Sequence, residues 1–349
     1  MLNKFFKKIN TKDVILLSAS IFIAVLFTVY KNNPYKITTP DIKSINEAPN
    51  PLSIDAMRNK TYPGSDFVIE ETLSPSKSYS QYIASYKSEG YKLFGLLTVP
   101  TGKRPTNGWP AIIFNHGYIP PEEYKTTERY VAYVDAFASN GYIVFKPDYR
   151  GNGNSEGNPE GAYYSPAYTE DVLNALASMK KYKDTDKNNI GMWGHSMGGN
   201  ITLRSLVVNN KDIKAAVIWG GVVGTYDDLL NKWRRTAPFK PSEKETLTRR
   251  STRQSIIDNY KTPRDNPTFW NSIDPTSYLK DITTPLQIHT GLDDEEVPPL
   301  FSEHLYNMLK QNNKYVELFE YEGADHNISG ASFTLAMQRS VDFFDSYLK

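Results

Sequence analysis

Cysteine is absent from the 349 residues of this chain. Its absence excludes disulfide bonds, thiolate metal sites, cysteine nucleophiles and attachment of a lipid to an N-terminal cysteine. It does not indicate a reducing compartment, because a chain of this length can bury a core large enough to fold without disulfides.

An excess of charge of either sign is also missing. The chain has 40 basic and 39 acidic side chains and a formal net charge of +1 at pH 7, so its charge predicts no nucleic acid or other polyanion as a partner. It contains no H-E-x-x-H motif and no His and Asp cluster at the spacing of metal ligands. We therefore expect neither a metal nor a cofactor.

One long hydrophobic run lies near the N-terminus, at residues 14–30. As a helix it would be about 25 Å long, at the short end for a membrane span. Four lysines precede it, a bias that predicts a cytoplasmic N-terminus and an extracytoplasmic remainder. We expect residues 1–35 to form a cytoplasmic tail and an uncleaved transmembrane anchor. The alternative is a signal peptide, whose cleavage would release a secreted protein.

The rest of the chain divides into two parts. Residues 36–77 carry several prolines among polar residues and show no periodicity, which predicts an extracytoplasmic linker. In residues 78–349, short apolar runs alternate with amphipathic segments, which predicts βαβ units in one large domain. No repeat with a period of 20–50 residues is visible, so we expect no β-propeller.

The expected elements of this domain begin with a hairpin, Tyr79–Tyr86 and Tyr91–Val99, that would form an antiparallel edge. Further strands are expected at residues 111–114, 142–145, 189–193, 215–219, 286–289 and 315–319. Helices are expected at residues 122–139, 166–181, 198–208, 303–309 and 332–348. The alternation predicts the α/β fold class, with a mostly parallel central sheet and helices on both faces.

A charged segment interrupts the alternation at about residues 225–271. It has helical patches at residues 229–235 and 245–260, and it follows a strand that ends at the carboxyl edge of the sheet. Because open α/β sheets bind ligands at this edge, we interpret the segment as a small helical cap. A solvated basic hairpin with no role in substrate binding fits the sequence equally well.

The sharpest motif is Gly194-His-Ser-Met-Gly198, a G-x-S-x-G pattern between an apolar strand and a helix. In this context the serine lies on a tight turn that presents its hydroxyl above the sheet. Side chains at the two glycine positions would clash with the neighbouring strand and helix. Ser196 is therefore the predicted nucleophile, and a glycine-rich helix start without chemistry is the alternative.

A serine hydroxyl needs an adjacent base that is oriented by a carboxylate. Among the histidines, His195 is directed away from the serine in such turns. His289 and His304 fall within a strand and a helix, where histidines are more often structural. His326 follows the last strand and precedes the last helix, in a loop at the edge of the sheet. We predict that His326 is the base.

The acidic partner is expected in Asp293-Asp-Glu-Glu296, four consecutive acids that follow the strand at residues 286–289. We choose Asp294 because of its spacing from the preceding glycine and the following Val-Pro pair, with Asp293 as the runner-up. With Asp294, the three residues occur in the order Ser, Asp, His, which is the order in α/β-hydrolases.

The negative charge that develops during acyl transfer needs two preorganised donors. The N–H of Met197 would be one, at the positive end of a helix. The other is expected in the loop after an early strand, where Gly117 permits a turn and the N–H of Tyr118 is the predicted donor. His116, beside them, is interpreted as a residue that orders this loop by a hydrogen bond.

Several motifs together carry a resemblance to a known family. They are Asn115-His-Gly117, Asp148-Tyr-Arg-Gly-x-Gly-x-Ser155, Gly194-His-Ser-Met-Gly-Gly199, Gly291-Leu-Asp-Asp294 and Gly323-Ala-Asp-His326. Residues 78–349 resemble the catalytic domain of prolyl oligopeptidase-like (S9) peptidases, within the α/β-hydrolase superfamily. In the second motif we expect Arg150 to brace its loop by pairing with carboxylates or carbonyls.

The resemblance implies Ser196, Asp294 and His326 as a catalytic triad and the N–H groups of Tyr118 and Met197 as oxyanion donors. Larger members of the family carry an N-terminal β-propeller that filters peptides. No such domain is expected in this chain, so peptidase specificity does not follow from the resemblance.

The sequence thus predicts a membrane-anchored serine hydrolase that cleaves a peptide, amide or ester bond of a small substrate through an acyl-serine intermediate. A carboxylesterase for small acyl esters is the close alternative, because the same residues serve esters and amides. A non-catalytic binding protein and a lipid-active hydrolase are more distant. Competent residues at all three triad positions argue against the former, and the lack of long apolar runs in the cap argues against the latter.

Overall fold

A computed structural model describes residues 49–234 and 243–349. In these two ranges, no helix has both the length and the apolar character needed to cross a membrane. The predicted cytoplasmic tail and transmembrane anchor, residues 1–35, lie outside the described residues, as does the predicted linker as far as residue 48.

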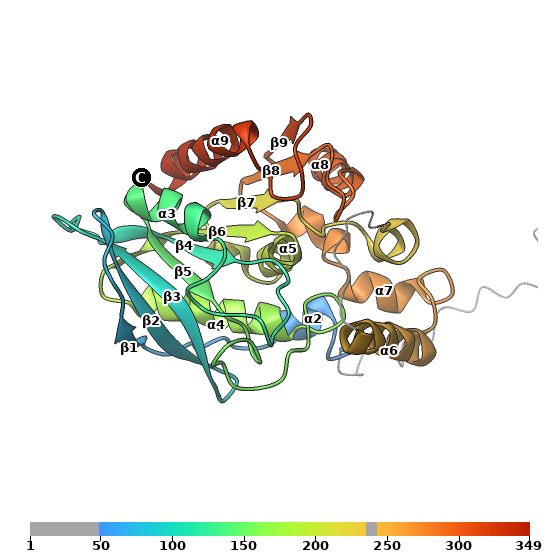
Figure 1. Cartoon of the computed structure of the whole chain (residues 1–349). Coiled ribbons are helices and arrows are strands. Elements are labelled where there is room, and N and C mark those ends of the chain that lie inside the picture. The colour runs from blue at the N-terminus through green and yellow to red at the C-terminus, as the bar shows by residue number, and fades with distance from the viewer. Residues whose placement is uncertain (1–48, 235–242) are drawn as a thin grey trace, which may run out of the picture. The chain divides into compact units, whose positions relative to one another are not determined.

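A nine-stranded sheet runs through the molecule in the order β1-β2-β3-β5-β4-β6-β7-β8-β9 (Figure 1). Neighbouring strands are parallel from β5 to β9. The bounds of these strands are β4 Trp109–Asn115, β5 Ile143–Pro147, β6 Thr185–His195, β7 Ala216–Trp219, β8 Leu286–Gly291 and β9 Val316–Tyr321. The predicted α/β class with a mostly parallel sheet is therefore confirmed.

The other side of the sheet is antiparallel. β2 (Tyr79–Ser88) and β3 (Tyr91–Pro100) form the predicted hairpin. The two residues of its turn, Glu89 and Gly90, have φ of 49° and 90°. Two central residues with positive φ make the tight turn whose twist matches that of antiparallel strands. β1 (Val68–Thr72) is an additional outer strand that pairs with β2.

Helices cover both faces of the sheet, as predicted (Figure 1). One face carries α3 Val131–Ser139 and α9 Ala331–Leu348, and the other carries α2 Ile54–Arg58, α4 Ala167–Lys181, α5 Met197–Asn209 and α8 Leu300–Gln311. A buried apolar cluster fills each interface. Both layers pack tightly on the parallel strands, and this fixes the loops at their carboxyl ends.

The predicted helix at residues 122–139 is wrong in its first half, because α3 starts only after Tyr130. The backbone of Tyr130 has φ of 55°, a left-handed conformation that a right-handed helix does not contain. Upstream, the hydroxyls of Tyr124 and Thr126 donate to the buried carboxylate of Asp148, at 2.8 and 2.6 Å. These bonds hold the segment as a loop against the end of β5.

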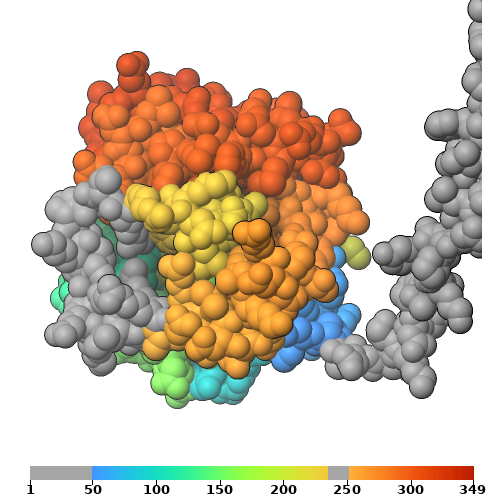
Figure 2. Space-filling view, turned by 90° about the vertical axis from the view of Figure 1, so that its right-hand side faces the viewer, coloured from blue at the N-terminus to red at the C-terminus, as the bar shows by residue number. Residues whose placement is uncertain are grey.

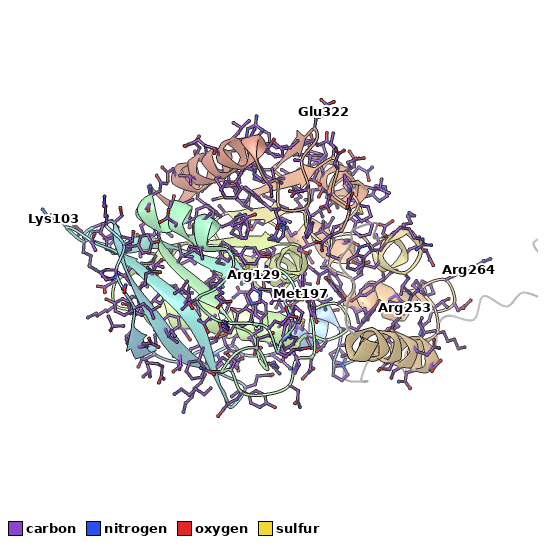
Figure 3. All side chains as sticks on the ribbon, viewed as in Figure 1. Lys103, Arg129, Met197, Arg253, Arg264 and Glu322 are labelled. Carbon is purple, nitrogen blue, oxygen red and sulfur yellow. The ribbon has the colours of Figure 1, made fainter. Side chains whose placement is uncertain are left out.

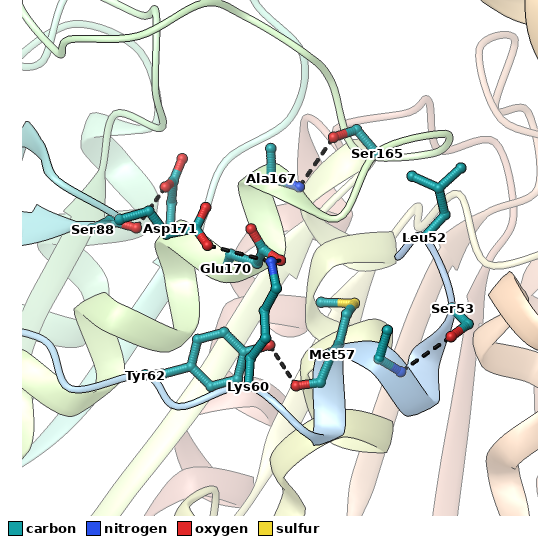
Figure 4. A network of polar contacts seen from close by, with 12 residues as sticks. Leu52, Ser53, Met57, Lys60, Tyr62, Ser88, Ser165, Ala167, Glu170 and Asp171 are labelled. Carbon is teal, nitrogen blue, oxygen red and sulfur yellow. Dashed lines mark hydrogen bonds and ion pairs between the residues drawn. The ribbon is translucent and has the colours of Figure 1, made fainter. Parts of the chain in front are cut away.

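The predicted linker at residues 36–77 is also wrong in the part that the structure describes. α2 buries Ile54 and Met57 completely, and it packs against α5. Lys60 then forms an ion pair with the buried Glu170 of α4 (Figure 4), and β1 extends the sheet. Apolar contacts and a buried charge thus attach this stretch to the domain, which begins well upstream of β2.

The described parts of the segment predicted as a cap are largely helical. They contain the π-helical turn η3 Asp228–Lys232, α6 Glu243–Tyr260 and most of α7 Pro267–Ile273, and the 3-10 helix η4 Pro275–Asp281 follows. Figure 2 shows the yellow part of this segment between the orange helices that follow it and the red C-terminal part of the chain. We call the described residues of this segment, 225–234 and 243–271, the cap.

Candidate active site

Ser196 lies on the turn between β6 and α5. Its backbone has φ of 56° and ψ of −119°, a strained conformation for a residue with a side chain. The N–H of Ser196 donates to the carbonyl of Trp219 at 3.0 Å, and its carbonyl accepts the N–H of Val222 at 3.0 Å. The neighbouring strand β7 and the loop after it therefore maintain the strained turn.

Close packing explains the two glycines that flank this serine. A side-chain carbon on Gly194 would lie 2.3 Å from the carbonyl oxygen of Gly198. One on Gly198 would lie 1.9 Å from the carbonyl oxygen of Asn115 in β4. Both distances are far below van der Waals contact. The predicted clash with the helix and the neighbouring strand is therefore confirmed.

His326 and Asp294 meet in the loops that follow β9 and β8. Nδ1 of His326 lies 2.7 Å from Oδ2 of Asp294, and both side chains are buried. The other oxygen, Oδ1, accepts the N–H groups of Glu296 and Val297 at 2.8 Å each. Because an ionised carboxylate only accepts, the hydrogen lies on Nδ1, and Nε2 of His326 is left as an acceptor.

The runner-up acid does not contact the histidine. Asp293 is exposed, and its backbone N–H donates to the carbonyl of Ala324 at 3.0 Å. This backbone bond joins the loops after β8 and β9 and thereby helps to bring Asp294 beside His326. Of the four consecutive acids, the one selected by its spacing is the partner of the imidazole.

Gly220, directly after β7, lies where the serine turn meets these two loops. A side-chain carbon at Gly220 would lie 3.1 Å from Nδ1 of His326 and 3.3 Å from Oδ2 of Asp294. Backbone hydrogen bonds join Ser196 to Trp219, directly before Gly220, and to Val222, two positions after it. The structure thus brings the three predicted triad residues to one edge of the sheet.

The residues predicted as oxyanion donors flank the serine. Met197 is the first residue of α5, so its N–H belongs to the open end of the helix. Tyr118 follows Gly117, and a side-chain carbon on Gly117 would lie 3.1 Å from Cβ of Ser196. The loop after β4 therefore passes directly beside the serine.

Three of the remaining histidines have structural contacts. His289 is fully buried in β8 and lies within hydrogen-bond distance of three side chains. His304 lies 3.4 Å from a carboxylate oxygen of Asp228. His116 donates from Nδ1 to the carbonyl of Gly117 at 2.7 Å, as predicted for a residue that orders this loop. Across residues 49–234 and 243–349, no three His, Asp or Glu side chains are grouped to hold a metal.

His195 has partners that the sequence does not predict. Its Nδ1 lies 2.7 Å from the hydroxyl of Tyr130, and its Nε2 lies 3.0 Å from the carbonyl oxygen of His326. The imidazole is buried, and its centroid is 4.5 Å from that of His326. Tyr130 falls in the segment wrongly expected to be helical, so no sequence signal identified it.

Buried charges support the loop after β5. The guanidinium of Arg150 pairs with the fully buried carboxylate of Asp171 at 2.7 Å and with Glu89 at 3.1 Å, which confirms the expected brace. Burial raises the pKa of Asp148 to about 6 and lowers the pKa of Lys146 to about 8. Burial therefore disfavours the charged form of both groups.

The start of the cap touches the loop that carries Asp294. The indole N–H of Trp233 donates to the carbonyl of Glu296 at 2.7 Å. Figure 3 places Met197 near the middle of the molecule and Arg264 far from it, on the outer part of the cap. The cap thus borders the candidate site at Trp233, while Arg264 lies away from it.

Comparison with known proteins identifies relatives along most of the chain. The pattern of the prolyl oligopeptidase family matches residues 129–349. The "Uncharacterized peptidase YtmA" of Bacillus subtilis (strain 168) is 27% identical over 253 residues, which are 72% of this chain and 88% of that protein. The "Quorum-quenching protein AidA" of Acinetobacter baumannii (strain MDR-ZJ06) is 30% identical over 133 residues, which are 38% of this chain and 41% of that protein.

Solved structures show the same fold. An acetyl xylan esterase from Paenibacillus sp. R4 has a TM-score of 0.62 at 19% identity, and the match covers 84% of this chain and 92% of that protein. An acylaminoacyl peptidase of Pyrococcus horikoshii has a TM-score of 0.62 at 21% identity, with 78% of this chain and 42% of that protein covered. These likenesses bear out the predicted α/β-hydrolase fold.

Proposed function

The chain belongs to the prolyl oligopeptidase family of α/β-hydrolases, and on this premise we propose that it is a serine hydrolase. It cleaves a peptide, amide or ester bond of a small substrate through an acyl-serine intermediate. The observation that carries the proposal is the 2.7 Å hydrogen bond between His326 and Asp294, at the sheet edge where Ser196 lies on its strained turn. An oriented imidazole beside a serine is the arrangement that activates a hydroxyl for acyl transfer.

In this proposal Ser196 is the nucleophile and His326 the general base. Nε2 of His326 takes the hydroxyl proton as the oxygen attacks the carbonyl carbon, and it then gives this proton to the leaving group. Asp294 keeps the ring in the required tautomer and stabilises its transient positive charge. A water molecule next attacks the acyl group, with His326 again as the base, and this step restores the serine.

The N–H groups of Met197 and Tyr118 are the proposed donors to the oxyanion. The position of Met197 at the first turn of α5 supports this role, because that N–H has no partner within the helix. The closeness of the Gly117 backbone to Ser196 supports the role of Tyr118. Loss of one such donor typically costs roughly a hundredfold to a thousandfold in rate.

Three likenesses bear on the bond that is cleaved. The relative matched over 88% of its own length is described as a peptidase, which supports cleavage of peptides. The acetyl xylan esterase is matched over 92% of its length, whereas the acylaminoacyl peptidase is matched over 42% of its length. The larger share of the esterase that is matched therefore supports an esterase for small acyl esters, which we propose as the second candidate.

Labelling with a fluorophosphonate probe tests the proposal. The wild type should be labelled and Ser196→Ala should not. Ser205→Ala is a matched control, because its buried hydroxyl on α5 has no hydrogen-bond partner to lose. Equal labelling of wild type and Ser196→Ala would contradict Ser196 as the nucleophile, and a wild type without labelling would favour a non-catalytic binding protein. A comparison of kcat/KM for aminoacyl arylamides with kcat/KM for p-nitrophenyl acyl esters distinguishes a peptidase, which should prefer the former, from an esterase, which should prefer the latter.

For the location, we propose that residues 14–30 hold the enzyme at the membrane, with the catalytic domain outside the cytoplasm. The support is the apolar run and the four lysines before it. In cells that express the full chain, the protein should sediment with the membranes, and protease added outside should degrade the catalytic domain. A shortened form in the medium would instead indicate a cleaved signal peptide.

A further inference from the structure

Three hydrogen bonds in series connect two loops on either side of the candidate serine. The N–H of Gly117 donates to the hydroxyl oxygen of Tyr130 at 2.9 Å. That oxygen lies 2.7 Å from Nδ1 of His195, and Nε2 of His195 lies 3.0 Å from the carbonyl oxygen of His326. The series therefore runs from the loop after β4 to the loop after β9.

The chemistry of the end groups fixes the direction of every bond. The carbonyl oxygen of His326 can only accept, so Nε2 of His195 carries a hydrogen and donates it. The N–H of Gly117 can only donate, so the oxygen of Tyr130 accepts it. The single hydroxyl hydrogen of Tyr130 must then point to Nδ1 of His195, which is the unprotonated nitrogen. With a neutral imidazole each donor and acceptor has one partner, and no other tautomer satisfies all three bonds.

The imidazole of His195 keeps this single tautomer because it is neutral. Burial, together with the charge that His326 can carry, lowers the pKa of His195 to about 3. At neutral pH, His195 is therefore uncharged. It holds its partners by neutral bonds and adds no charge that would oppose protonation of His326.

The two ends of the series belong to the loops that carry the proposed oxyanion donor and the proposed base, and the distance between these two groups must stay fixed. Gly117 directly precedes Tyr118, a proposed oxyanion donor, and His326 is the proposed base. The contact at Gly117 is tight, since a side-chain carbon there would lie 2.6 Å from the hydroxyl oxygen of Tyr130. A shift of either loop would break a bond in the series.

Tyr133, in the first turn of α3, provides a comparison within the same structure. The hydroxyl of Tyr133 donates to the carbonyl of Asn327 at 2.9 Å, so it also contacts the loop of His326. Its ring packs against Phe333, with centroids 4.9 Å apart. Its hydroxyl bonds to the His326 loop alone and is not part of the Gly117 series. Replacing either tyrosine by phenylalanine removes a hydroxyl near the start of α3. Only the change at Tyr130 interrupts the series.

We propose that Tyr130 and His195 are positioning residues for acyl transfer, which couple the oxyanion loop at Gly117 to the backbone of the base His326. The inference rests on the proposed function and deepens it. Neither side chain reacts with the substrate; together they fix the distance between the oxyanion donor and the base. A displacement of about 1 Å at a reacting group can cost a hundredfold in rate, so loss of the series should affect the chemical step more than binding.

The rate of inactivation by a fluorophosphonate tests the coupling, because this probe does not require a known substrate. Tyr130→Phe should lower the maximal inactivation rate by about tenfold to a hundredfold, with the half-saturating probe concentration within threefold of wild type. Tyr133→Phe should stay within threefold of wild type in both. A wild-type inactivation rate in Tyr130→Phe would overturn the positioning role. It would also be overturned if both variants lost the same inactivation rate together with the same thermal stability.

A double-mutant cycle separates positioning from a general packing role. His195→Phe keeps a ring of similar size and removes both hydrogen bonds. If the two residues act through one series, the variant with both substitutions should be no slower than His195→Phe alone. Multiplicative losses would contradict the coupling. Ser196→Ala in the same assay identifies which proposal fails, since labelling of that variant overturns the serine hydrolase itself, whereas its full loss leaves only the positioning role in question.

Discussion

Asp294 holds His326 through one carboxylate oxygen only, at 2.7 Å from Nδ1, because two backbone N–H groups occupy the other oxygen. The carboxylate cannot rotate without breaking all three bonds. It is therefore a fixed reference for the orientation of the imidazole, and a change of its chemistry should alter catalysis without altering the fold.

Asp294→Asn should test this relationship. Its amide oxygen would keep the two backbone N–H bonds, so the amide nitrogen would face Nδ1 and force the hydrogen of the ring onto Nε2. The imidazole could then no longer accept the serine proton, and we expect kcat to fall by about 10⁴-fold with little change in unfolding temperature. Asp293→Asn, at an exposed neighbour, is the control and should retain wild-type kcat. A loss of less than tenfold in Asp294→Asn would contradict the assignment.

Gly198→Ala should unfold the domain more readily and abolish labelling of Ser196. Its methyl group would lie 1.9 Å from a backbone oxygen of Asn115, which cannot move without distorting β4. Such overpacking costs about 3 kcal/mol of unfolding free energy, measurable by urea denaturation. Gly161→Ala is a useful comparison. That glycine has φ of 79° and open space around it, so only backbone strain of about 1 kcal/mol is expected. Equal losses in the two variants would exclude the steric explanation.

The stability of the protein should depend on the protonation of Asp148. Burial raises its pKa from 3.8 to about 6. The resulting stabilisation is fully present below pH 4 and is lost as the pH rises through about 6. Between pH 4.5 and pH 7, the unfolding free energy of wild type should therefore fall by about 2 kcal/mol relative to that of Asp148→Asn. Urea titrations at these pH values measure the difference, and a difference independent of pH would refute the prediction.

Arg150→Met should destabilise the domain by about 3–5 kcal/mol, because it leaves the carboxylate of Asp171 buried without a cation. The more accessible pair of Arg104 and Asp184, 3.2 Å apart, offers a control. Arg104→Met should cost less than about 1 kcal/mol, since water already screens that pair. Thermal unfolding of both variants should show a clear difference, and similar midpoints would mean that the buried pair contributes no more than an exposed one.

The order of the core elements and the meeting of Ser196, Asp294 and His326 at one edge of the sheet could be predicted because both depend on local patterns. β7 is a continuous run of buried apolar residues, and the turn at Ser196 carries glycines that the packing requires at both positions. His326 and Asp294 each follow a strand, so the topology of a parallel sheet was sufficient to place them at one edge.

Features that depend on partners distant in the sequence could not be predicted. The helical pattern before Tyr130 is real, but the hydroxyls of Tyr124 and Thr126 are bonded to Asp148, and this competes with helix formation. The role of Lys60 is similar, because its partner Glu170 lies 110 positions away. Proline content indicated a tether here, whereas contacts with α4 and α5 decide the structure.

The outermost strand, β1, limits further growth of the sheet. All five of its residues are exposed, and a bulge between Ile69 and Glu71 interrupts its register. Glu70 adds an ion pair with Lys92 at 2.8 Å. A kinked, acidic strand is a poor template for pairing with another polypeptide. This edge should therefore resist fibrillar aggregation even when the protein is concentrated.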